Sequence, residues 1–304
     1  MAISRAQLVK ELEPGLNALF GLEYKRYENQ HAEIYTTESS DRAFEEEVML
    51  SGFANAQVKA EGQGVSFDEA QETYTARYTH DTIALAFAIT EEAIEDNLYD
   101  RIASRYTKAL ARSMSNAKQV KAVTPLNNGL SSVATFNSGD GVSLFSTNHT
   151  TVSGTAVKNT LTTQADLNET SLEQALIDIS AMTDERGLRV AARGVKMIIP
   201  SANQFNAERL MKSQGRTGTA DNDINAVASM GMIPQGYRVN NFLTDTDSWY
   251  IITDVPNGMK LFQRAALKTA MEGDFDTGNV RYKARERYSF GVSDYRGIFG
   301  VEGA

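Results

Sequence analysis

Residues 51–89 contain two segments with the two-residue periodicity of a β-hairpin, and this hairpin lacks the apolar area to bury itself. Small apolar residues alternate with polar ones over residues 54–61, and Tyr74 and Tyr78 alternate with polar residues in the return arm. A glycine-containing link over residues 62–72 joins the two arms. A two-stranded ribbon is marginal in water unless a further strand or surface covers it. The ribbon is therefore either an arm that docks on another chain or a hairpin that lies on its own domain.

If the hairpin docks on another chain, polar and aromatic residues of its two arms and the glycines of its link are the candidate contacts between subunits. These residues are Lys59, Glu61, Gly62, Gly64, Tyr74, Arg77 and Tyr78.

The length, cysteine content, apolar runs and net charge of the chain limit the class of protein to which it can belong. At 304 residues, the chain exceeds the size at which a single core usually keeps growing, so two subdomains or one elongated body are expected. The absence of cysteine excludes disulfides, zinc-thiolate sites and thiol nucleophiles. No apolar run has the length of a signal peptide or membrane span, so we expect a cytosolic protein without a membrane partner. A net charge of −9 argues against a general nucleic-acid binder.

Residues 91–121 have the pattern of a long helix. Thr90 is a suitable N-cap, acidic residues crowd the first turns, and basic residues fill the remainder, as the helix dipole favours. Apolar residues recur every four positions from Ile94 to Met114, so the apolar stripe winds around the helix. At 1.5 Å per residue the helix would be roughly 46 Å long. We expect it to form the spine of an elongated subunit.

The segments on either side of the hairpin give weaker signals. Ser4 and Gln7 form a capping box for a short helix, which we expect to end near Pro14. The polar residues 24–41 predict an extended connection, and the uncharged residues 83–89 predict a strand that could bury both faces.

A region rich in Ser, Thr, Asn and Gly over residues 124–163 predicts a subdomain boundary. Thr170 and Glu173 form a second capping box. The elements expected after the boundary are a helix over 170–187, a strand over 195–199, a helix over 201–210, an exposed loop over 213–236, and strands over 249–253 and 259–262.

The last strand, over residues 280–292, separates apolar from basic side chains. The basic face carries Arg281, Lys283, Arg285 and Arg287. This face could be solvated and paired locally, or it could contact an acidic segment such as residues 45–47 of a neighbouring chain. Contact with nucleic acid ranks below both interpretations.

The sequence contains no catalytic signature. A nucleophile elbow, a phosphate-binding Gly-Lys-Ser/Thr loop, paired histidines at helical spacing and a dinucleotide fingerprint are all missing. The three histidines, His31, His80 and His149, lie far apart in sequence, so each is expected to be structural. We therefore predict no enzyme activity, no cofactor and no metal site.

The order of several short stretches resembles the major capsid proteins of tailed bacteriophages, most closely the Mu-type major head subunit family, whose Hong-Kong-97 fold is shared with encapsulin shells. The resemblance extends over nearly the whole chain. The stretches that carry it are residues 56–62 (AQVKAEG), 78–80 (YTH), 88–93 (AITEEA), 96–99 (DNLY), 144–146 (LFS) with His149, and 287–297 (RYSFGVSDYRG).

The resemblance implies an α+β fold. Its expected parts are an N-terminal arm (1–40), an extended hairpin called the E-loop (41–81), a peripheral domain with the spine helix (82–123 and 273–304), and an axial α/β domain (124–272). It also implies a structural protein of the virion that is assembled in the bacterial cytoplasm. Hexamers and pentamers would tile an icosahedral head around double-stranded DNA, with a portal and a separate scaffolding protein as partners.

Two other functions remain open at this point. One is an encapsulin-like compartment for a cargo protein, and the other is a stand-alone enzyme or binding module that uses the Ser, Thr and Asn-rich middle region.

Overall fold

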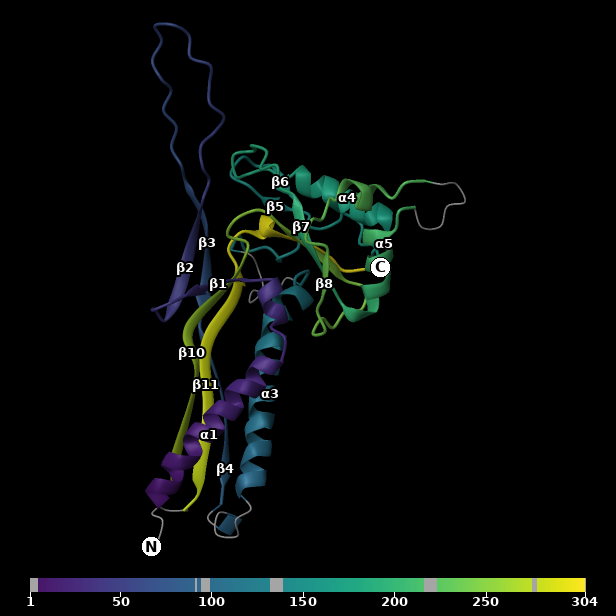
Figure 1. The fold of residues 1–304 in the computed structure, drawn as a ribbon. Coiled ribbons are helices and arrows are strands. Elements are labelled where there is room, and N and C mark those ends of the chain that lie inside the picture. Colours follow the sequence, from purple (N-terminus) through teal and green to yellow (C-terminus); the bar gives the residue numbers. More distant parts are fainter. Residues whose placement is uncertain are drawn as a thin grey trace.

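The computed structural model describes residues 5–90, 92–93, 99–131, 139–215, 223–274 and 278–303. The fold is mixed α+β and elongated (Figure 1). A long sheet with two helices forms one end, a more compact α/β part lies beside its upper half, and a hairpin projects beyond both.

The long sheet has the strand order β1-β10-β11-β4. Its strands are β1 (Thr36–Ser39), β10 (Met259–Gly273), β11 (Val280–Val292) and β4 (Asp81–Ile89). β1 runs parallel to β10, and the other neighbours are antiparallel. The alternation predicted for residues 280–292 is confirmed, because Tyr282, Ala284 and Tyr288 are buried whereas Arg281 and Lys283 are exposed.

Two helices, α1 (Arg5–Arg26) and α3 (Tyr99–Asn127), cover the inner face of this sheet. Leu16 and Phe20 of α1 share one buried cluster with Met114 of α3 and with the inner face of β11. The side chain of Asn17 fixes α1 further, because its Oδ1 accepts hydrogen bonds from Tyr282 (2.8 Å) and from Thr269 (2.7 Å).

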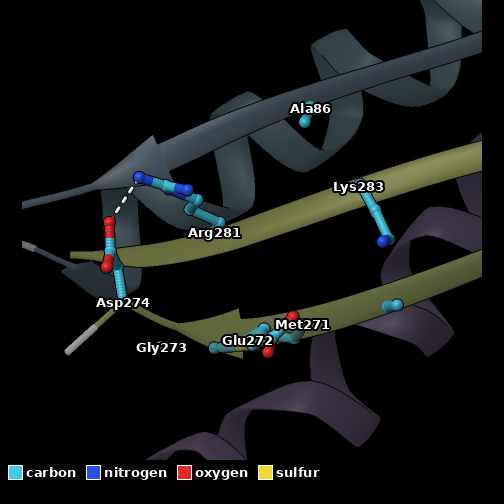
Figure 2. Close-up of a pocket in the computed structure, with 8 residues that line it drawn as sticks. Ala86, Met271, Glu272, Gly273, Asp274, Arg281 and Lys283 are labelled. Carbon is cyan, nitrogen blue, oxygen red and sulfur yellow. Dashed lines mark hydrogen bonds and ion pairs between the residues drawn. The ribbon is translucent and has the colours of Figure 1, made fainter.

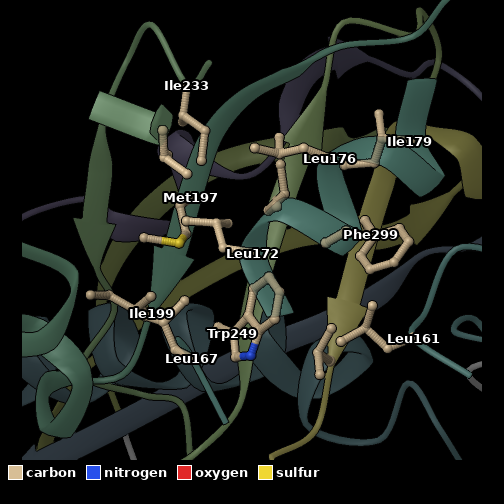
Figure 3. Packing of buried hydrophobic residues seen from close by; sticks show 14 of the residues in the cluster. Leu161, Leu167, Leu172, Leu176, Ile179, Met197, Ile199, Ile233, Trp249 and Phe299 are labelled. Carbon is tan, nitrogen blue, oxygen red and sulfur yellow. The ribbon is translucent and has the colours of Figure 1, made fainter. Parts of the chain in front are cut away.

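A second sheet has the order β12-β9-β7-β8. Its strands are β12 (Ile298–Val301), β9 (Trp249–Thr253), β7 (Gly194–Ile199) and β8 (Tyr237–Val239). The helices of this part are α4 (Glu169–Ser180), α5 (Gln204–Lys212) and α6 (Ala226–Met230). Trp249, Leu172, Met197 and Phe299 lie at the centre of the largest buried cluster (Figure 3).

The remaining elements are short or project from the body. β2 (Phe44–Leu50) and β3 (Glu72–Thr79) form the hairpin, and β5 (His149–Thr150) pairs with β6 (Ala156–Val157). Single 3₁₀ turns, η1, η3 and η4, occur at Gln30–Glu33, Ser201–Asn203 and Tyr295–Gly297.

The spine helix differs from its prediction at the carboxyl end. Residues 91 and 94–98 lie outside the described residues, and the described α3 continues to Asn127, past the predicted end at residue 121. Ala122, Val123 and Leu126 are buried against the upper part of the long sheet and against β7 and β9. This packing holds the last turns in the helix even though Pro125 lies there.

The predicted end of the first helix near Pro14 is wrong. Its proposed cap, Ser4, lies outside the described residues, but α1 continues through Pro14 to Arg26. Pro14 lies on the exposed side of the helix, and the burial of Leu16 and Phe20 just after it offsets the missing backbone hydrogen bond. Residues 24–41, predicted as an extended connection, contain the end of α1, η1 and β1.

The strand over residues 83–89 is present, but the prediction that both its faces could be buried is wrong. β4 is the edge strand of the long sheet, and Ala84, Ala86 and Ala88 are exposed on the face opposite the helices.

Within the second part, strands 195–199 and 249–253 are confirmed. The predicted cap of the helix over 170–187 is wrong. Asn168 is the N-cap of α4, because its Oδ1 accepts from the backbone N–H of Ser171 at 2.9 Å. α4 ends at Ser180, and α6 lies inside the loop predicted over 213–236, of which residues 216–222 are not described.

The two sheets divide the chain at other residues than the expected domains do. Residues 259–272 were expected in the axial domain, but they form β10 of the long sheet. β12, expected in the peripheral domain, pairs with β9 of the second sheet. The chain therefore crosses between the two sheets at residues 256–258 and again at residues 293–297.

Candidate functional site

The hairpin is formed by different residues from those predicted. β2 (Phe44–Leu50) pairs with β3, with Phe44 opposite Thr79 and Glu47 opposite Ala76. Residues 54–61, predicted as the first arm, form no strand. The prediction missed β2 because its three consecutive glutamates have low β-propensity. The sequence signal that could have located it is the placement of Phe44, Val48 and Leu50 at alternate positions.

The root of the hairpin lies on its own subunit. Tyr78 is 3% exposed, and its ring packs edge-on against Phe262, with 4.8 Å between the ring centroids. A side chain at Gly291 would lie 2.4 Å from the Tyr78 ring, so only glycine permits this approach. The Tyr78 hydroxyl hydrogen-bonds the hydroxyl of Ser293. The side chain of Tyr78 is therefore covered by its own subunit and has little surface left for contact with a neighbour.

The other two return-arm candidates have different surroundings. Tyr74 is half-buried, and its hydroxyl lies 3.5 Å from the carbonyl of Ser293, so the body of its own subunit holds much of this side chain. Arg77 is exposed, lies 4.0 Å from the ring centroid of Phe44 and is 3.7 Å from the carboxylate of Glu46. Of these three candidates, Arg77 is exposed, Tyr74 is half-buried and Tyr78 is buried.

Ion pairs fix the root of the hairpin to the long sheet. Lys260, which is buried, pairs with the carboxylates of Glu47 and of Glu38, the latter at 3.1 Å. Burial favours the neutral amine, but the hydrogen bonds to the two carboxylates outweigh it and raise the pKa of Lys260. Glu45 accepts a hydrogen bond from Ser40 at 2.7 Å. Residues 45–47 thus use their carboxylates in contacts within their own subunit. This argues against the interpretation that they pair with the basic strand of a neighbouring subunit.

Beyond the root, the hairpin continues as an exposed loop over residues 51–71, which we call the tip loop. All its residues from Phe53 onward are exposed, including Val58 at 100% and Phe67 at 97%. The candidates at its end, Lys59, Glu61, Gly62 and Gly64, are all exposed. Gly62 has φ +78° in the turn, a conformation that favours glycine.

A few hydrogen bonds hold the base of the tip loop. The backbone N–H of Ser51 donates to the carbonyl of Gln71 at 2.8 Å. Asp68 accepts from the backbone N–H of Ala54 at 2.7 Å, and this hydrogen bond lowers the pKa of Asp68. The guanidinium of Arg186, in the second part of the molecule, donates to the carbonyl of Glu69. The base is therefore fixed, whereas the apolar side chains farther out remain uncovered.

The basic strand lies on the face of the long sheet that α1 and α3 leave open, which we call the outer face. Arg281, Lys283 and Arg285 are exposed there, and Arg287 is half-buried. Arg281 pairs with Asp274 (Figure 2). The alternate position Glu286 points to the inner face and pairs with Lys118 at 3.2 Å, and burial raises the pKa of Glu286.

The three histidines are each held by neighbours in the same chain. His31 hydrogen-bonds Gln119 at 3.0 Å, and burial, with Lys118 nearby, lowers its pKa to about 4. His80 lies 2.9 Å from Ser40 and from Ser289, and burial lowers its pKa.

His149 is fully buried between a carboxylate and an amide. It lies 2.6 Å from Asp140 and 3.1 Å from Asn159, and its ring stacks on Tyr295. Among the residues that the structure describes, no three His, Cys, Asp or Glu side chains gather as metal ligands. No helix in the described part of the chain is long and apolar enough to span a membrane.

Comparisons with known proteins agree with this architecture. Comparison with curated protein sequences gives no match. The capsid of Myoviridae phage XM1 is 10% identical with a TM-score of 0.52, covering 89% of each chain. The procapsid of bacteriophage JBD30 is 14% identical with a TM-score of 0.55, covering 99% of this chain and 77% of that one. The virus-like particle from Pyrococcus furiosus is 10% identical with a TM-score of 0.56, covering 95% and 98%.

These structural similarities establish the fold, and the sequence establishes the family. Residues 73–301, most of the chain, match the sequence model of a family described as phage capsid protein. The α+β, Hong-Kong-97-type fold expected from the sequence is confirmed. The chain therefore belongs to the phage capsid protein family and is a structural protein of the capsid.

Proposed function

We propose that this chain is the major head subunit of a Mu-type tailed phage, which assembles as hexamers and pentamers into an icosahedral head around double-stranded DNA. It performs no catalysis and is found in the virion after assembly in the bacterial cytoplasm, with a portal and a scaffolding protein as partners. The observation that carries the proposal is the tip loop, which exposes Phe53, Val58, Val65 and Phe67 beyond the body of the subunit.

The energetics of the tip loop favour association. A fully buried Val or Phe side chain contributes about 1.5 to 3 kcal/mol relative to an exposed one. The four exposed apolar residues gain this only if another surface covers them. A closed symmetric shell repeats the same contact many times, so each contact can be modest while the assembly is stable.

The two sheets support a division into domains. We assign residues 1–40 to an N-terminal arm and residues 41–81 to the E-loop. The peripheral domain comprises residues 82–127 and 259–292, and the axial domain comprises 128–258 and 293–304. These boundaries follow the sheet membership of β10 and β12. Within the E-loop, Lys59, Glu61, Gly62, Gly64 and Arg77 remain the proposed inter-subunit contacts.

The alternative function is a compartment that holds a cargo protein. The virus-like particle from Pyrococcus furiosus has a similar fold, so the fold alone does not distinguish the two functions. Purified particles from infected cells distinguish them, because a phage head contains double-stranded DNA and a cargo compartment contains a second protein.

Negative-stain microscopy of the expressed chain tests the proposal. The unchanged chain should form closed shells. A variant in which a short Gly-Asn link replaces residues 53–69 keeps β2 and β3 and should fold, because the removed residues are all exposed. It should remain as small oligomers on size exclusion, with an unchanged circular dichroism spectrum. Normal shells from this variant, or a stable monomer from the unchanged chain, would contradict the proposal.

A further inference from the structure

The side of α3 that faces away from the long sheet carries an unpaired basic stripe. Arg105, Lys108 and Arg112 are exposed, and helical spacing places them on one side of the helix over a length of about 10 Å. Among the described residues, no carboxylate lies within ion-pair distance of these three side chains. Lys108 and Arg112 lie one helical turn apart, where like charges repel each other. The stripe therefore weakens the helix unless an anion from outside the subunit binds to it.

The helix dipole explains the cations of α1 but not this stripe. Lys25 and Arg26 lie in the last turn of α1, where positive charge is favourable, and Arg26 also pairs with Glu23 at 3.4 Å. Arg112 lies well before the end of α3 at Asn127, and the dipole acts only within the last turn. The stripe therefore needs a different source of negative charge.

A hollow of about 520 Å³ beside the stripe adds neutral hydrogen-bond donors. It lies between the end of α1 and the middle of α3, which pack against each other (Figure 1). Tyr27 lines one side of the hollow, and the exposed Ser113 and Asn116 line the other. Hydroxyl and amide groups of this kind bind phosphate oxygens together with Lys and Arg. Lys108 and Arg112 line the same hollow, so cationic and neutral donors can converge on one anion.

The stripe matches the backbone of double-stranded DNA in length and charge. Each strand carries one phosphate per roughly 3.4 Å of the duplex axis, so about three phosphates of one strand lie along 10 Å. The net charge of the chain is −9, so the rest of the surface repels DNA and the contact is confined to the stripe. Contacts to phosphate carry no sequence information, so the stripe can bind any stretch of a genome.

The outer face of the long sheet is the other basic surface, and it is less suited to phosphate. Its hollow contains Glu272 and Asp274 beside Arg281, and Asp274 pairs with Arg281 (Figure 2). These carboxylates repel phosphate, whereas Glu23, the carboxylate that lines the hollow between α1 and α3, is paired with Arg26. The two basic surfaces lie on opposite sides of the sheet, so only one of them can face the inside of a shell.

We propose that the surface of α1 and α3 faces the interior of the head, and that Arg105, Lys108 and Arg112 bind the phosphate backbone of the enclosed DNA. This inference rests on the proposed function and identifies the side of the subunit, and the side chains, that meet the DNA. Because the contact is electrostatic, it weakens steeply as salt is added.

Chemical labelling of lysines in whole particles tests the contact directly. DNA-filled heads from infected cells, and the same heads emptied of DNA, are acetylated briefly, and the modified lysines are quantified by mass spectrometry. Lys108 should react at least about threefold more slowly in the filled heads, because phosphates then surround its amine. Lys283, which is exposed on the outer face, should react equally in both.

Charge reversal gives a second readout on dissociated subunits. Fluorescence anisotropy measures the binding of a labelled DNA duplex at increasing salt concentrations. Lys108→Glu/Arg112→Glu should lower the affinity by at least about tenfold and reduce the slope of log affinity against log salt by about two. The matched control Arg189→Glu/Arg193→Glu changes the net charge equally, at two exposed arginines outside the long sheet, and should stay within about twofold of the unchanged chain because salt screens distant charges. Circular dichroism should show the same helix content in both variants.

The outcomes separate this inference from the proposed function. If the unchanged chain forms no shells, or the particles contain a cargo protein and no DNA, the proposed function fails. If the heads contain DNA but Lys108 reacts equally in filled and emptied heads, this inference alone is wrong. Protection of Lys283 in place of Lys108 would also overturn it, because the outer face would then face the DNA. An equal loss of duplex binding in the α3 variant and its control would mean that net charge, and not the stripe, governs binding.

Discussion

The core around Trp249 and the tip loop differ in what covers their apolar side chains. Leu172, Trp249 and Phe299 are completely buried by other parts of the same chain. Phe53, Val58 and Phe67 contact solvent instead. The first region carries its stability within one subunit, whereas the second can gain stability only from another chain. Substitutions in the two regions should therefore separate folding from assembly.

The largest effect on folding is expected in the buried core. Leu172→Ala removes a fully buried side chain of α4 and should lower the free energy of unfolding by about 3 to 4 kcal/mol, because the surrounding helices and strands cannot close the cavity. Urea titration followed by the fluorescence of Trp249, the single tryptophan, measures this. The control Phe205→Ala, at a 73% exposed position of α5, should change it by less than about 0.5 kcal/mol.

Acidification should weaken the subunit through His31, which is buried beside α3. Burial lowers its pKa from 6.5 to about 4, so the unfolded chain takes up a proton that the folded chain does not. The stability contributed by neutral His31 is complete above pH 6.5, is lost as the pH falls towards 4, and changes little below that. The difference between the two pKa values corresponds to roughly 3 kcal/mol.

Urea midpoints of dissociated subunits at pH 7.5 and pH 5 measure this loss. In His31→Asn the decrease should be much smaller, and the remainder should come mainly from His80, whose pKa burial also lowers. An equal decrease in His31→Asn and in the unchanged chain would contradict the assignment. The tip loop contains no histidine, so its removal should leave the pH dependence unchanged.

The sequence predicted the regular helices and strands better than it predicted the surfaces against which they pack. β11, β9 and the described part of the spine helix follow from periodicity, because one face of each is buried over several turns or residue pairs. The continuation of α1 past Pro14 could not be read locally, because it depends on Leu16 and Phe20 packing against β11, whose residues lie more than 200 positions later in the chain.

The hairpin shows the same limit at the candidate site. Tyr74 and Tyr78 alternate as a strand should, but their cover comes from Phe262, Gly291 and Ser293, which are remote in sequence. Periodicity located the return strand and the basic face correctly, but it paired the return strand with the wrong arm. Local pattern identifies which residues share a face and does not identify which surface covers that face.

The root of the hairpin lies between the two extremes of the comparison and should show an intermediate effect. Tyr78→Phe removes the hydrogen bond to Ser293 but keeps the ring against Phe262, so the free energy of unfolding should fall by about 1 kcal/mol. Urea titration at pH 7.5, where the histidines are neutral in both states, measures this. Thr75→Ala, at an exposed position of the same strand, is the control and should have a smaller effect. Equal effects at both positions would mean that the root is no better anchored than the exposed side of the hairpin.

The smallest effect on folding should accompany a large effect on assembly. Val58→Ser and Phe67→Ser replace side chains that are 100% and 97% exposed, so the free energy of unfolding of the dissociated subunit should change by less than about 0.5 kcal/mol. If a neighbour covers the tip loop as proposed, each substitution removes apolar contact area in the shell, and the concentration at which shells form should rise several-fold. Light scattering against subunit concentration measures this threshold. Asn55→Ser, in the same loop but already polar, should leave it unchanged, and an unchanged threshold for Val58→Ser and Phe67→Ser would mean that the tip loop is not covered by another subunit.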